Sequence, residues 1–400
     1  MNTFAMLIIL CLVIILSALF GALNKKTNFP TVLSLLVLGV VMQHVFNRYD
    51  LHFEKQQLLE FLGNVGIIFI VLEAALDLKI SSKKRTLISK SFWLALISLI
   101  GCMLVLSTLF KVFLQNLGWV QCLLYALPLS LVSSAIVIPS VHHMSEEKKD
   151  FLIYESTFSD ILGIMAFYFL VNNLDETSVL KVTVNILSST VLTVVVSIVS
   201  SLVLFYVFHK MVHRHIRFSV FIAVLVLLYA LGKLFHLSSL LLILIYGVLL
   251  SNHKTLLNKF HLPSDWVDPH LSDELLSHFK LITDEGSFII RTLFFVIFGM
   301  YLSFDDIFSL QNMLISGLFI AGIYIIHYIL LKIFFKKNIT PEVYIAPRGL
   351  ISILLFFAIP KNYLIAEIES SLLFIVIVVT SVVMGFGLMI QSKNKPKLES

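Results

Sequence analysis

The sequence predicts an all-α polytopic membrane protein with about 13 transmembrane helices. Of its 400 residues, 58% are hydrophobic and only 13% are charged, and the mean hydropathy is +0.98. A soluble globular chain is closer to roughly 45–50% apolar and about 25% charged. The apolar residues also gather into runs, and a run of about 18 or more is long enough to cross the hydrocarbon. Because backbone groups in lipid must hydrogen-bond within their own segment, repeated runs indicate a helical bundle.

The apolar runs place the predicted spans at residues 4–23, 29–46, 58–77, 92–113, 118–141, 151–172, 180–208, 217–235, 238–251, 287–303, 309–334, 342–360 and 369–391. The first run has no basic segment before it and no clear small-residue cleavage site, so we interpret it as a span rather than a signal peptide. The longest stretch between spans, 252–286, has apolar residues at helical spacing and predicts a short interfacial helix on the cytoplasmic face.

Lysine and arginine are concentrated in alternate loops between these spans. The basic set of loops contains Lys25, Lys26, Lys79, Lys83, Lys84, Arg85, Lys90, Lys148, Lys149, Lys210, Arg214, Arg217, Lys254, Lys259, Lys280, Lys336, Lys337 and the tail lysines Lys393, Lys395 and Lys397. The other set has few basic residues and contains acidic pairs such as Asp305–Asp306. By the positive-inside rule we expect the N-terminus outside and the C-terminus in the cytoplasm, which requires an odd number of spans.

The composition argues against several classes of protein. The three cysteines, Cys11, Cys102 and Cys122, lie in apolar runs and predict neither a disulfide framework nor a metal site. The sequence has no GxxxxGK[ST] phosphate-binding loop and no region long enough for a nucleotide-binding domain, which argues against ATP-driven transport by this chain. A net charge of +5 with its basic residues in loops is explained by membrane topology before nucleic-acid binding. We expect neither an enzyme nor a cofactor.

Short sequence similarities relate the two halves of the chain. The segment VLGVVM around Gly39 in the second span resembles IYGVLLS around Gly247 in the ninth. The segment FIVLEAAL in the third span resembles FFVIFGMY in the tenth. The members of each pair are seven spans apart and therefore run in opposite directions. This pattern favours an inverted repeat, a common architecture in transporters.

The densest polar cluster at membrane depth lies in the sixth span, where the chain reads Tyr-Glu-Ser-Thr-Phe-Ser-Asp from 154 to 160. Ser156 and Thr157 precede Asp160 by four and three residues, so their oxygens share one face of a helix. A carboxylate beside hydroxyls is a suitable oxygen shell for a hard monovalent cation. The alternative is a buried carboxylate that binds a neighbouring helix. Ionisable residues inside spans are costly and usually functional, which favours a transport role for Asp160.

Two prolines predict interruptions of the helices. Pro139 in the fifth span removes a backbone donor, so freed carbonyls near Val137 would point toward an ion, although an ordinary kink fits equally. In the twelfth span, Pro347-Arg348-Gly349 also indicates a broken helix. Arg348 needs an anion inside the span, and Glu155 is the first choice; the alternative is that Arg348 reaches the headgroups.

These motifs resemble the monovalent cation:proton antiporter superfamily, which includes the sodium/proton antiporters and sodium/hydrogen exchangers. The resemblance covers nearly the whole chain, and its most specific piece is Glu155-Ser156-x-x-Ser159-Asp160, similar to the family's E-S-x-x-N-D core. In that core the final Asp binds the ion or proton, the Ser contributes a hydroxyl and the Glu pairs with an Arg. That Arg lies in an R-G-x-x-S motif, which the chain matches from Arg348 to Ser352.

The resemblance implies one transporter domain over residues 1–400, with a first repeat at about 1–175, a linker helix at about 180–208 and an inverted second repeat at about 215–391. It implies a core domain of spans 4–6 and 11–13, in which the broken spans 5 and 12 cross near Asp160. The remaining spans would form a dimerisation domain, so we expect a homodimer. The resemblance to bacterial antiporters also implies the bacterial inner (cytoplasmic) membrane.

Two positions depart from the family pattern. Ser159 stands before Asp160, where electroneutral members have Asn and electrogenic members have Asp. Many sodium/proton exchangers have T-D-P in the fifth span, whereas this chain has Val137-Ile138-Pro139. The S-S-x-I-V pattern there is more similar to the potassium-efflux branch. The sequence therefore leaves the choice between Na⁺, Li⁺ and K⁺ open.

The predicted function is secondary antiport of a monovalent cation, Na⁺ or Li⁺ before K⁺, against protons at one buried Asp. The residues predicted to form the cation and proton site are Asp160, Ser156, Thr157, Ser159 and Val137, with Asp160 and Ser156 as the direct ligands of the transported cation. The alternatives are a potassium-efflux-type K⁺/H⁺ antiporter, an ion channel, or a membrane sensor or scaffold that kept the fold and lost transport. A single titrating carboxylate predicts near-electroneutral exchange.

Overall fold

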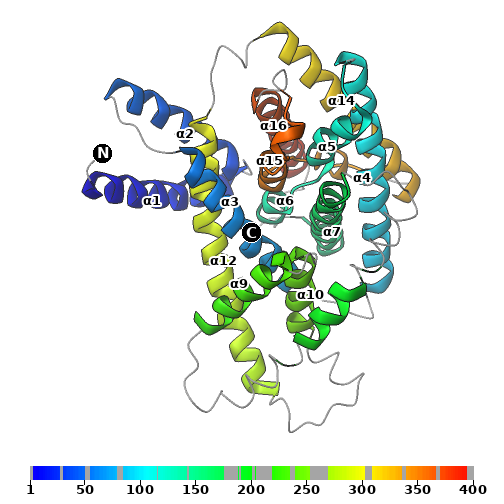
Figure 1. The fold of residues 1–400 in the computed structure, drawn as a ribbon. Coiled ribbons are helices and arrows are strands. Elements are labelled where there is room, and N and C mark those ends of the chain that lie inside the picture. The colour runs from blue at the N-terminus through cyan, green and yellow to red at the C-terminus, as the bar shows by residue number, and fades with distance from the viewer. Residues whose placement is uncertain are drawn as a thin grey trace. The chain divides into compact units, whose positions relative to one another are not determined.

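A computed structural model describes residues 3–27, 30–49, 55–78, 84–114, 116–141, 144–174, 188, 191–200, 203, 219–234, 239–252, 269–301, 309–335, 339–365 and 370–393. In these ranges the regular structure is helical, without a strand, which confirms the predicted all-α fold (Figure 1). Much of the predicted linker helix at 180–208 lies outside the described residues, as does the stretch 253–268.

Most helices overlap the predicted spans. Their bounds are α1 Thr3–Thr27, α2 Thr31–Arg48, α3 Lys55–Asp77, α4 Arg85–Phe113, α5 Trp119–Ser130, α6 Ser134–Ser140, α7 Glu146–Asn172, α9 Ser219–Leu234, α10 Ser239–Ser251, α12 Pro269–Gly299, α14 Leu310–Phe335, the 3₁₀ turns η4 Glu342–Tyr344 and η5 Lys361–Tyr363, α15 Leu350–Phe357 and α16 Ser370–Lys393. By length and composition, five described segments can each cross a membrane: Thr31–Arg48, Arg85–Phe113, Trp119–Ser140 (α5 and α6 together), Asn312–Phe335 and Ser371–Ile390.

The predicted interfacial helix before the tenth span is not a separate element. Instead α12 runs without interruption for 31 residues, from Pro269 to Gly299. The buried face of the helix explains this, because Phe279, Thr283, Ser287 and Ile290 recur at helical spacing through the expected boundary. No proline lies after the first residue of the helix to end it.

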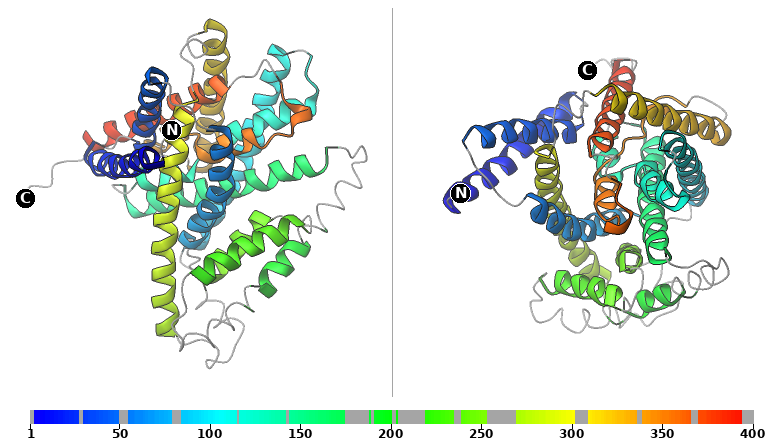
Figure 2. Two further views of the ribbon diagram at one scale, coloured as in Figure 1. Left: turned by 60° about the vertical axis from the view of Figure 1, so that its left-hand side comes forward. Right: turned by 45° about the horizontal axis from the view of Figure 1, so that its top comes forward.

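The chain divides into two compact units. The first comprises Met1–Gly63, Thr86–Gly163 and Ile289–Ser400, and the second comprises Asn64–Arg85 and Ile164–Phe288. In the first unit α1 packs against α2, α5 against α15, and α14 against α16 (Figure 2). In the second unit α9 packs against α10. The division into two repeats and a core domain remains a prediction.

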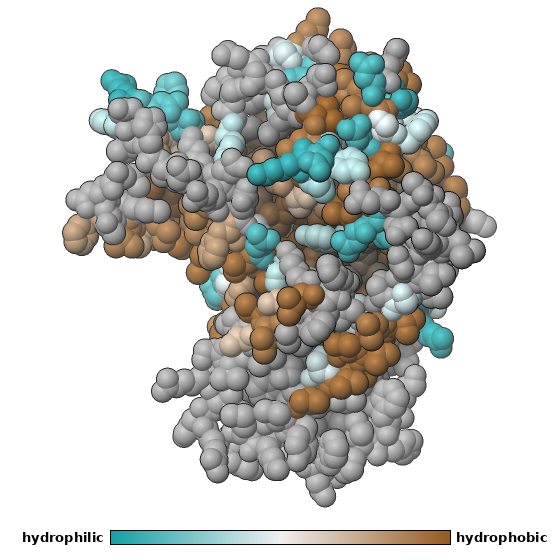
Figure 3. Space-filling view, viewed as in Figure 1, coloured by the Kyte–Doolittle hydropathy of each residue, from teal (hydrophilic) through white to brown (hydrophobic). Residues whose placement is uncertain are grey.

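The outer surface of α1 is strongly apolar. Leu12, Ile15 and Leu19 are 51%, 56% and 54% exposed, and Figure 3 shows apolar atoms along this helix. Its only basic residues, Lys25 and Lys26, lie in the last turn. A soluble surface rarely exposes a continuous apolar face of this kind, whereas lipid matches it.

Two glycine contacts support the inverted repeat. A Cβ added to Gly39 of α2 would lie 2.9 Å from the Cα of Gly299 in α12, so these backbones approach closely. A Cβ added to Gly247 of α10 would lie 2.6 Å from the Cβ of Ala75 in α3. The second span thus packs on the tenth in the first unit, and the ninth packs on the third in the second unit. An inverted repeat that relates span 2 to span 9 and span 10 to span 3 requires this correspondence between the two contacts.

Candidate functional site

Two helix interruptions cross in the first unit. The first is the extended segment Leu131–Ser133 between α5 and α6, and the second is the non-helical segment 345–349 before α15. The backbone N–H of Ser133 donates to the carbonyl of Pro347 at 2.9 Å. A Cβ at Gly349 would lie 2.7 Å from the Cβ of Ser133. The two breaks are therefore in direct contact, which confirms the predicted pair of broken, crossing helices.

The first break lies earlier in the chain than predicted. Val137 and Pro139 are inside α6, and the carbonyl of Val137 accepts the N–H of Val141 at 3.2 Å. The prediction of a free carbonyl at Val137 is therefore wrong. The physical reason is that Pro139 only deprives the carbonyl four residues before it, that of Ala135, of its helical donor. The interruption at Leu131–Ser133 is instead bound by partners from other elements.

Adjacent side chains of α7 bind the amides of the first break. Asp160 accepts the N–H of Ser134 through Oδ2 at 2.9 Å. Ser159 accepts the N–H of Val132 through Oγ, also at 2.9 Å. Both side chains are 3% exposed. Buried amides outside regular helices need such acceptors, so α7 fixes the position of the break. Ser159 acts here as a structural acceptor.

Several buried oxygens around Asp160 have no hydrogen-bond partner. They are Oδ1 of Asp160, Oγ1 of Thr157 and Oγ of Ser133. Ser156 donates its hydroxyl hydrogen to the carbonyl of Leu152 at 2.7 Å, and its oxygen keeps lone pairs that can bind a cation. Buried polar atoms usually find partners, so this set points to a ligand. Because Thr157 and Ser156 lie three and four residues before Asp160, these oxygens share the face of α7 predicted from the sequence.

This oxygen set contains a single carboxylate. No group of three or more His, Cys, Asp or Glu side chains that could hold a metal ion occurs in the described ranges. One negative charge beside neutral hydroxyl oxygens matches the charge of one monovalent cation or one proton. Burial makes an unpaired carboxylate costly, so binding of either positive species is favoured.

The expected direct ion pair between Glu155 and Arg348 is not formed. Both carboxylate oxygens of Glu155 lack a hydrogen-bond partner. The guanidinium of Arg348 donates to the carbonyl of Leu129 through Nε at 2.7 Å and to that of Ala346 through Nη1 at 3.2 Å. The reason is that both carbonyls are left over at interruptions, Leu129 in the last turn of α5 and Ala346 in the second break. The charges of Arg348 and Glu155 still interact through space.

Sequence reasoning missed His327, a buried neighbour of Glu155, and the residues bound to it. His327 of α14 is 1% exposed, and its Nδ1 lies 3.9 Å from Oε1 of Glu155. Its Nε2 lies 3.1 Å from the carbonyl oxygen of Glu342. The carboxylate of Glu342 forms an ion pair with Lys148 at 2.6 Å. A signal was present in the sequence, because a single histidine inside the apolar eleventh span is costly and indicates a role.

The chain was compared with known proteins by family and by structure. A family model described as "Sodium/hydrogen exchanger, transmembrane" matches residues 12–391. The fold is similar to a structure of the sodium proton antiporter MjNhaP1 from Methanocaldococcus jannaschii at pH 8, with 19% identity, a TM-score of 0.69, and coverage of 98% of this chain and 100% of that chain. An electron-microscopy structure of the same antiporter gives 19% identity, a TM-score of 0.68 and coverage of 99% and 100%. A search of curated proteins returned no significant match.

Proposed function

Because this chain belongs to the sodium/hydrogen exchanger family, we propose that it exchanges a monovalent cation for protons at Asp160. It is an integral membrane protein with the fold of a sodium proton antiporter. One observation carries the proposal: the buried Asp160 has one carboxylate oxygen without a partner, beside the unpartnered hydroxyl of Thr157. The unpartnered hydroxyl of Ser133 belongs to the residue next to Ser134, whose N–H binds the other oxygen of Asp160.

The exchange follows from the chemistry of one buried carboxylate. Removal from water favours the neutral, protonated form, whereas a bound cation favours the charged form. Asp160 therefore holds a proton or a cation at any moment, but not both. Thr157, Ser133 and Ser156 supply neutral oxygens to the cation, and Val137 is left out because its carbonyl already accepts a helical hydrogen bond. Ser159 binds the backbone of the break instead.

Transport further requires that Asp160 be exposed to each side of the membrane in turn. In our proposal a core of spans 4–6 and 11–13 carries Asp160 past the remaining spans, through which two copies form a homodimer. We further propose a bacterial inner membrane, with the N-terminus outside and the C-terminus in the cytoplasm, as the positive-inside rule predicts from the basic loops. The contact between Ser133 and Pro347 supports this arrangement, since it links the two broken helices directly.

The test is proton flux in proteoliposomes that contain the purified protein, with Na⁺, Li⁺ and K⁺ added in turn. We expect Na⁺ and Li⁺ to drive proton movement more strongly than K⁺. Stronger flux with K⁺ would instead support a potassium-efflux-type antiporter, and flux without counter-movement of protons would support a channel. Absence of cation-dependent proton flux would contradict the proposal and favour a sensor or scaffold.

We expect the exchange to be electroneutral, one cation for one proton. The oxygen set contains one carboxylate, and Ile138 stands where many exchangers carry a second acid. Recording on a solid-supported membrane measures this directly, with a protonophore-treated sample as the control. A transient current that grows with substrate concentration would contradict the one-for-one ratio.

A further inference from the structure

The side chains of His327 and Glu155 place unsatisfied acceptors opposite each other. Nδ1 of His327 and both carboxylate oxygens of Glu155 have no hydrogen-bond partner, and Nδ1 lies 3.9 Å from Oε1. The two residues are each 1% exposed. Two acceptors cannot bond to each other, so this arrangement lacks one hydrogen. A proton added at Nδ1 would turn the ring from an acceptor into a charged donor facing this carboxylate, at the distance of an ion pair.

The other ring nitrogen of His327 fixes where that proton can bind. Nε2 lies 3.1 Å from the carbonyl oxygen of Glu342, and a carbonyl can only accept. The neutral ring therefore carries its hydrogen on Nε2 and has a lone pair on Nδ1, toward Glu155. A second proton can enter only at Nδ1, which makes the ring a cation next to a carboxylate.

The charged groups around His327 come from three other segments. Glu155 and Lys148 lie on α7, Glu342 lies on η4, and Arg348 lies in the second break. Arg348 opposes a second positive charge, but its guanidinium is bound to the carbonyls of Leu129 and Ala346. Glu342 is paired with Lys148, so Glu155 is the carboxylate left to balance a charged His327.

The exposure of the side chains decreases from Lys148 at the surface to the buried pair of His327 and Glu155. The side chain of Lys148 is 30% exposed, that of its partner Glu342 is 10%, and those of His327 and Glu155 are 2% and 1%. Lys148 and Glu342 therefore lie between water and the buried ring. Of the groups around His327, these two therefore lie nearest to water.

We propose that Nδ1 of His327 is a second proton-binding site, separate from Asp160, whose positive charge is balanced by the Glu155 carboxylate. Its occupancy weakens the binding of any positive species at Asp160. Glu155 and Asp160 are five residues apart on α7, about 7–8 Å along the helix axis. A unit charge roughly 10 Å away, at an effective dielectric constant near 20, changes binding at Asp160 by about tenfold. The effect on transport rests on the proposed function, whereas the existence of the site does not.

The site itself is tested by NMR of the full-length protein in lipid with isotope-labelled histidine. The ring signal of His327 is identified among the 13 histidines by its loss in His327→Gln, or in His327→Asn if the first variant does not fold. We expect this ring to change from neutral to charged as pH falls. In Glu155→Gln the change should move to lower pH by about one unit or disappear, since the charged ring loses its counter-charge. A ring that stays neutral throughout, or that titrates identically in Glu155→Gln, would overturn the proposal.

The consequence for transport is tested with the pH profile of cation-driven proton flux. Its acidic limb is the range in which flux falls as the pH falls. With the cation well below its KM, we expect this limb to lie about one pH unit higher in His327→Gln than in the wild type, because Asp160 then binds protons about tenfold more tightly at acid pH. With saturating cation the shift should vanish, because the charge repels proton and cation alike. A purely structural role of His327 would not produce this dependence on cation concentration.

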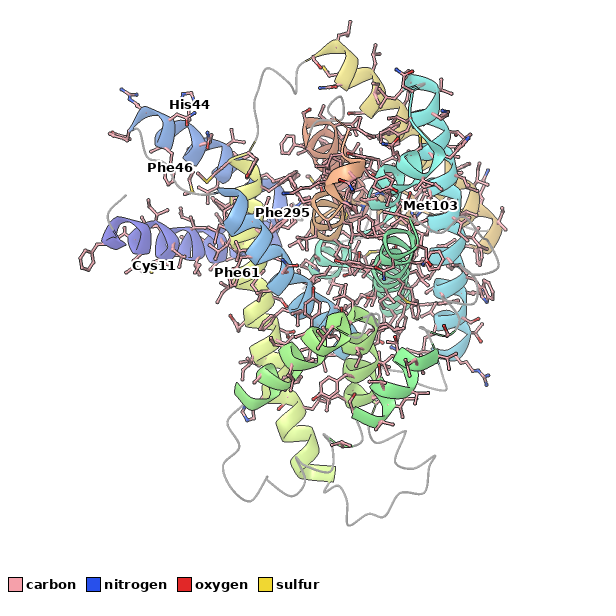
Figure 4. The ribbon with its side chains drawn as sticks, in the orientation of Figure 1. Cys11, His44, Phe46, Phe61, Met103 and Phe295 are labelled. Atoms are coloured by element: carbon pink, nitrogen blue, oxygen red, sulfur yellow. The ribbon has the colours of Figure 1, made fainter. Side chains whose placement is uncertain are left out.

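The matched control is His44→Gln, the same substitution at an exposed histidine of α2 (Figure 4). It should keep the wild-type profile at both cation concentrations. An unchanged limb in His327→Gln, or an equal shift in His44→Gln, would overturn the coupling to Asp160. If the wild type shows no cation-driven flux at all, the proposed function fails, and the NMR result still decides whether His327 binds a proton.

Discussion

Replacing Asp160 with Asn is expected to reduce cation-dependent proton flux by at least about a hundredfold. Removal of one partner from a buried charge pair costs about 3–5 kcal/mol, which is more than a hundredfold in binding. Asn cannot ionise, so it can neither release a proton nor balance a bound cation. Its side-chain oxygen can still accept the N–H of Ser134, the bond that Asp160 now makes at 2.9 Å. The variant therefore tests the charge and leaves the anchor of the helix break in place.

Two measurements accompany this prediction. Thermal unfolding in detergent should give Asp160→Asn a midpoint at or above that of the wild type, because a buried neutral amide costs less than a buried carboxylate with an unpaired oxygen. Glu147→Gln, the same change of carboxylate to amide at an exposed position in the first turn of α7, should leave flux unchanged. Undiminished flux in Asp160→Asn would exclude this carboxylate as the exchange site.

The sequence predicted the features that depend on local pattern. Apolar runs predicted the spans, and the spacing of Ser156, Thr157 and Asp160 placed their oxygens on one face of a helix. The stretch before the tenth span was predicted less well. A stretch of lower hydropathy suggested a boundary between two helices. The buried face from Phe279 to Ile290 instead continues through it within α12.

The features that could not be predicted depend on contacts between distant segments. The first break lies at Leu131–Ser133 because Ser159, Asp160 and Pro347 bind its amides, and no local rule locates those partners. For the same reason the direct hydrogen-bond partners of Arg348 were not predicted. A buried guanidinium was expected to need a carboxylate, but carbonyls left unpaired at two helix interruptions supply its acceptors.

The acidic residues of the two units differ in whether they have a basic partner. In the second unit Lys280 forms an ion pair with Asp77, and its charge also interacts with Glu73 and Asp284. The acid of the third span, Glu73, thus has a nearby basic group, which favours a structural role for it. In the first unit the acids differ: Glu342 has a lysine partner, whereas Glu155 and Asp160 each have oxygens without a hydrogen-bond partner. We therefore expect added protons or cations to have their largest effect at or beside these two carboxylates.

The second large effect is expected at the crossing itself, from Gly349→Ala. A Cβ there would lie 2.7 Å from the Cβ of Ser133 and 3.0 Å from Cδ1 of Ile136, and both neighbours belong to the other broken helix. Overpacking of this kind costs about 1–3 kcal/mol or more. We expect a clear fall in the thermal unfolding midpoint, together with at least about a tenfold loss of flux as the N–H of Ser133 separates from Pro347. Gly317→Ala is the control, because a Cβ at that exposed position of α14 meets nothing within 4 Å. It should leave the midpoint unchanged or raise it, since Ala favours a helix by up to about 1 kcal/mol over Gly.

A compensating substitution separates the steric cause from other effects of Gly349→Ala. Ser133→Gly removes the Cβ and Oγ that the new methyl group would meet, so the double variant should recover most of the lost stability. Its flux need not recover, because Ser133 also supplies one of the oxygens proposed to bind the cation. Recovery of the midpoint without recovery of flux would therefore separate the two roles of this residue, in packing and in binding. If the double variant is as unstable as Gly349→Ala alone, the contact between the two breaks is not what limits this position.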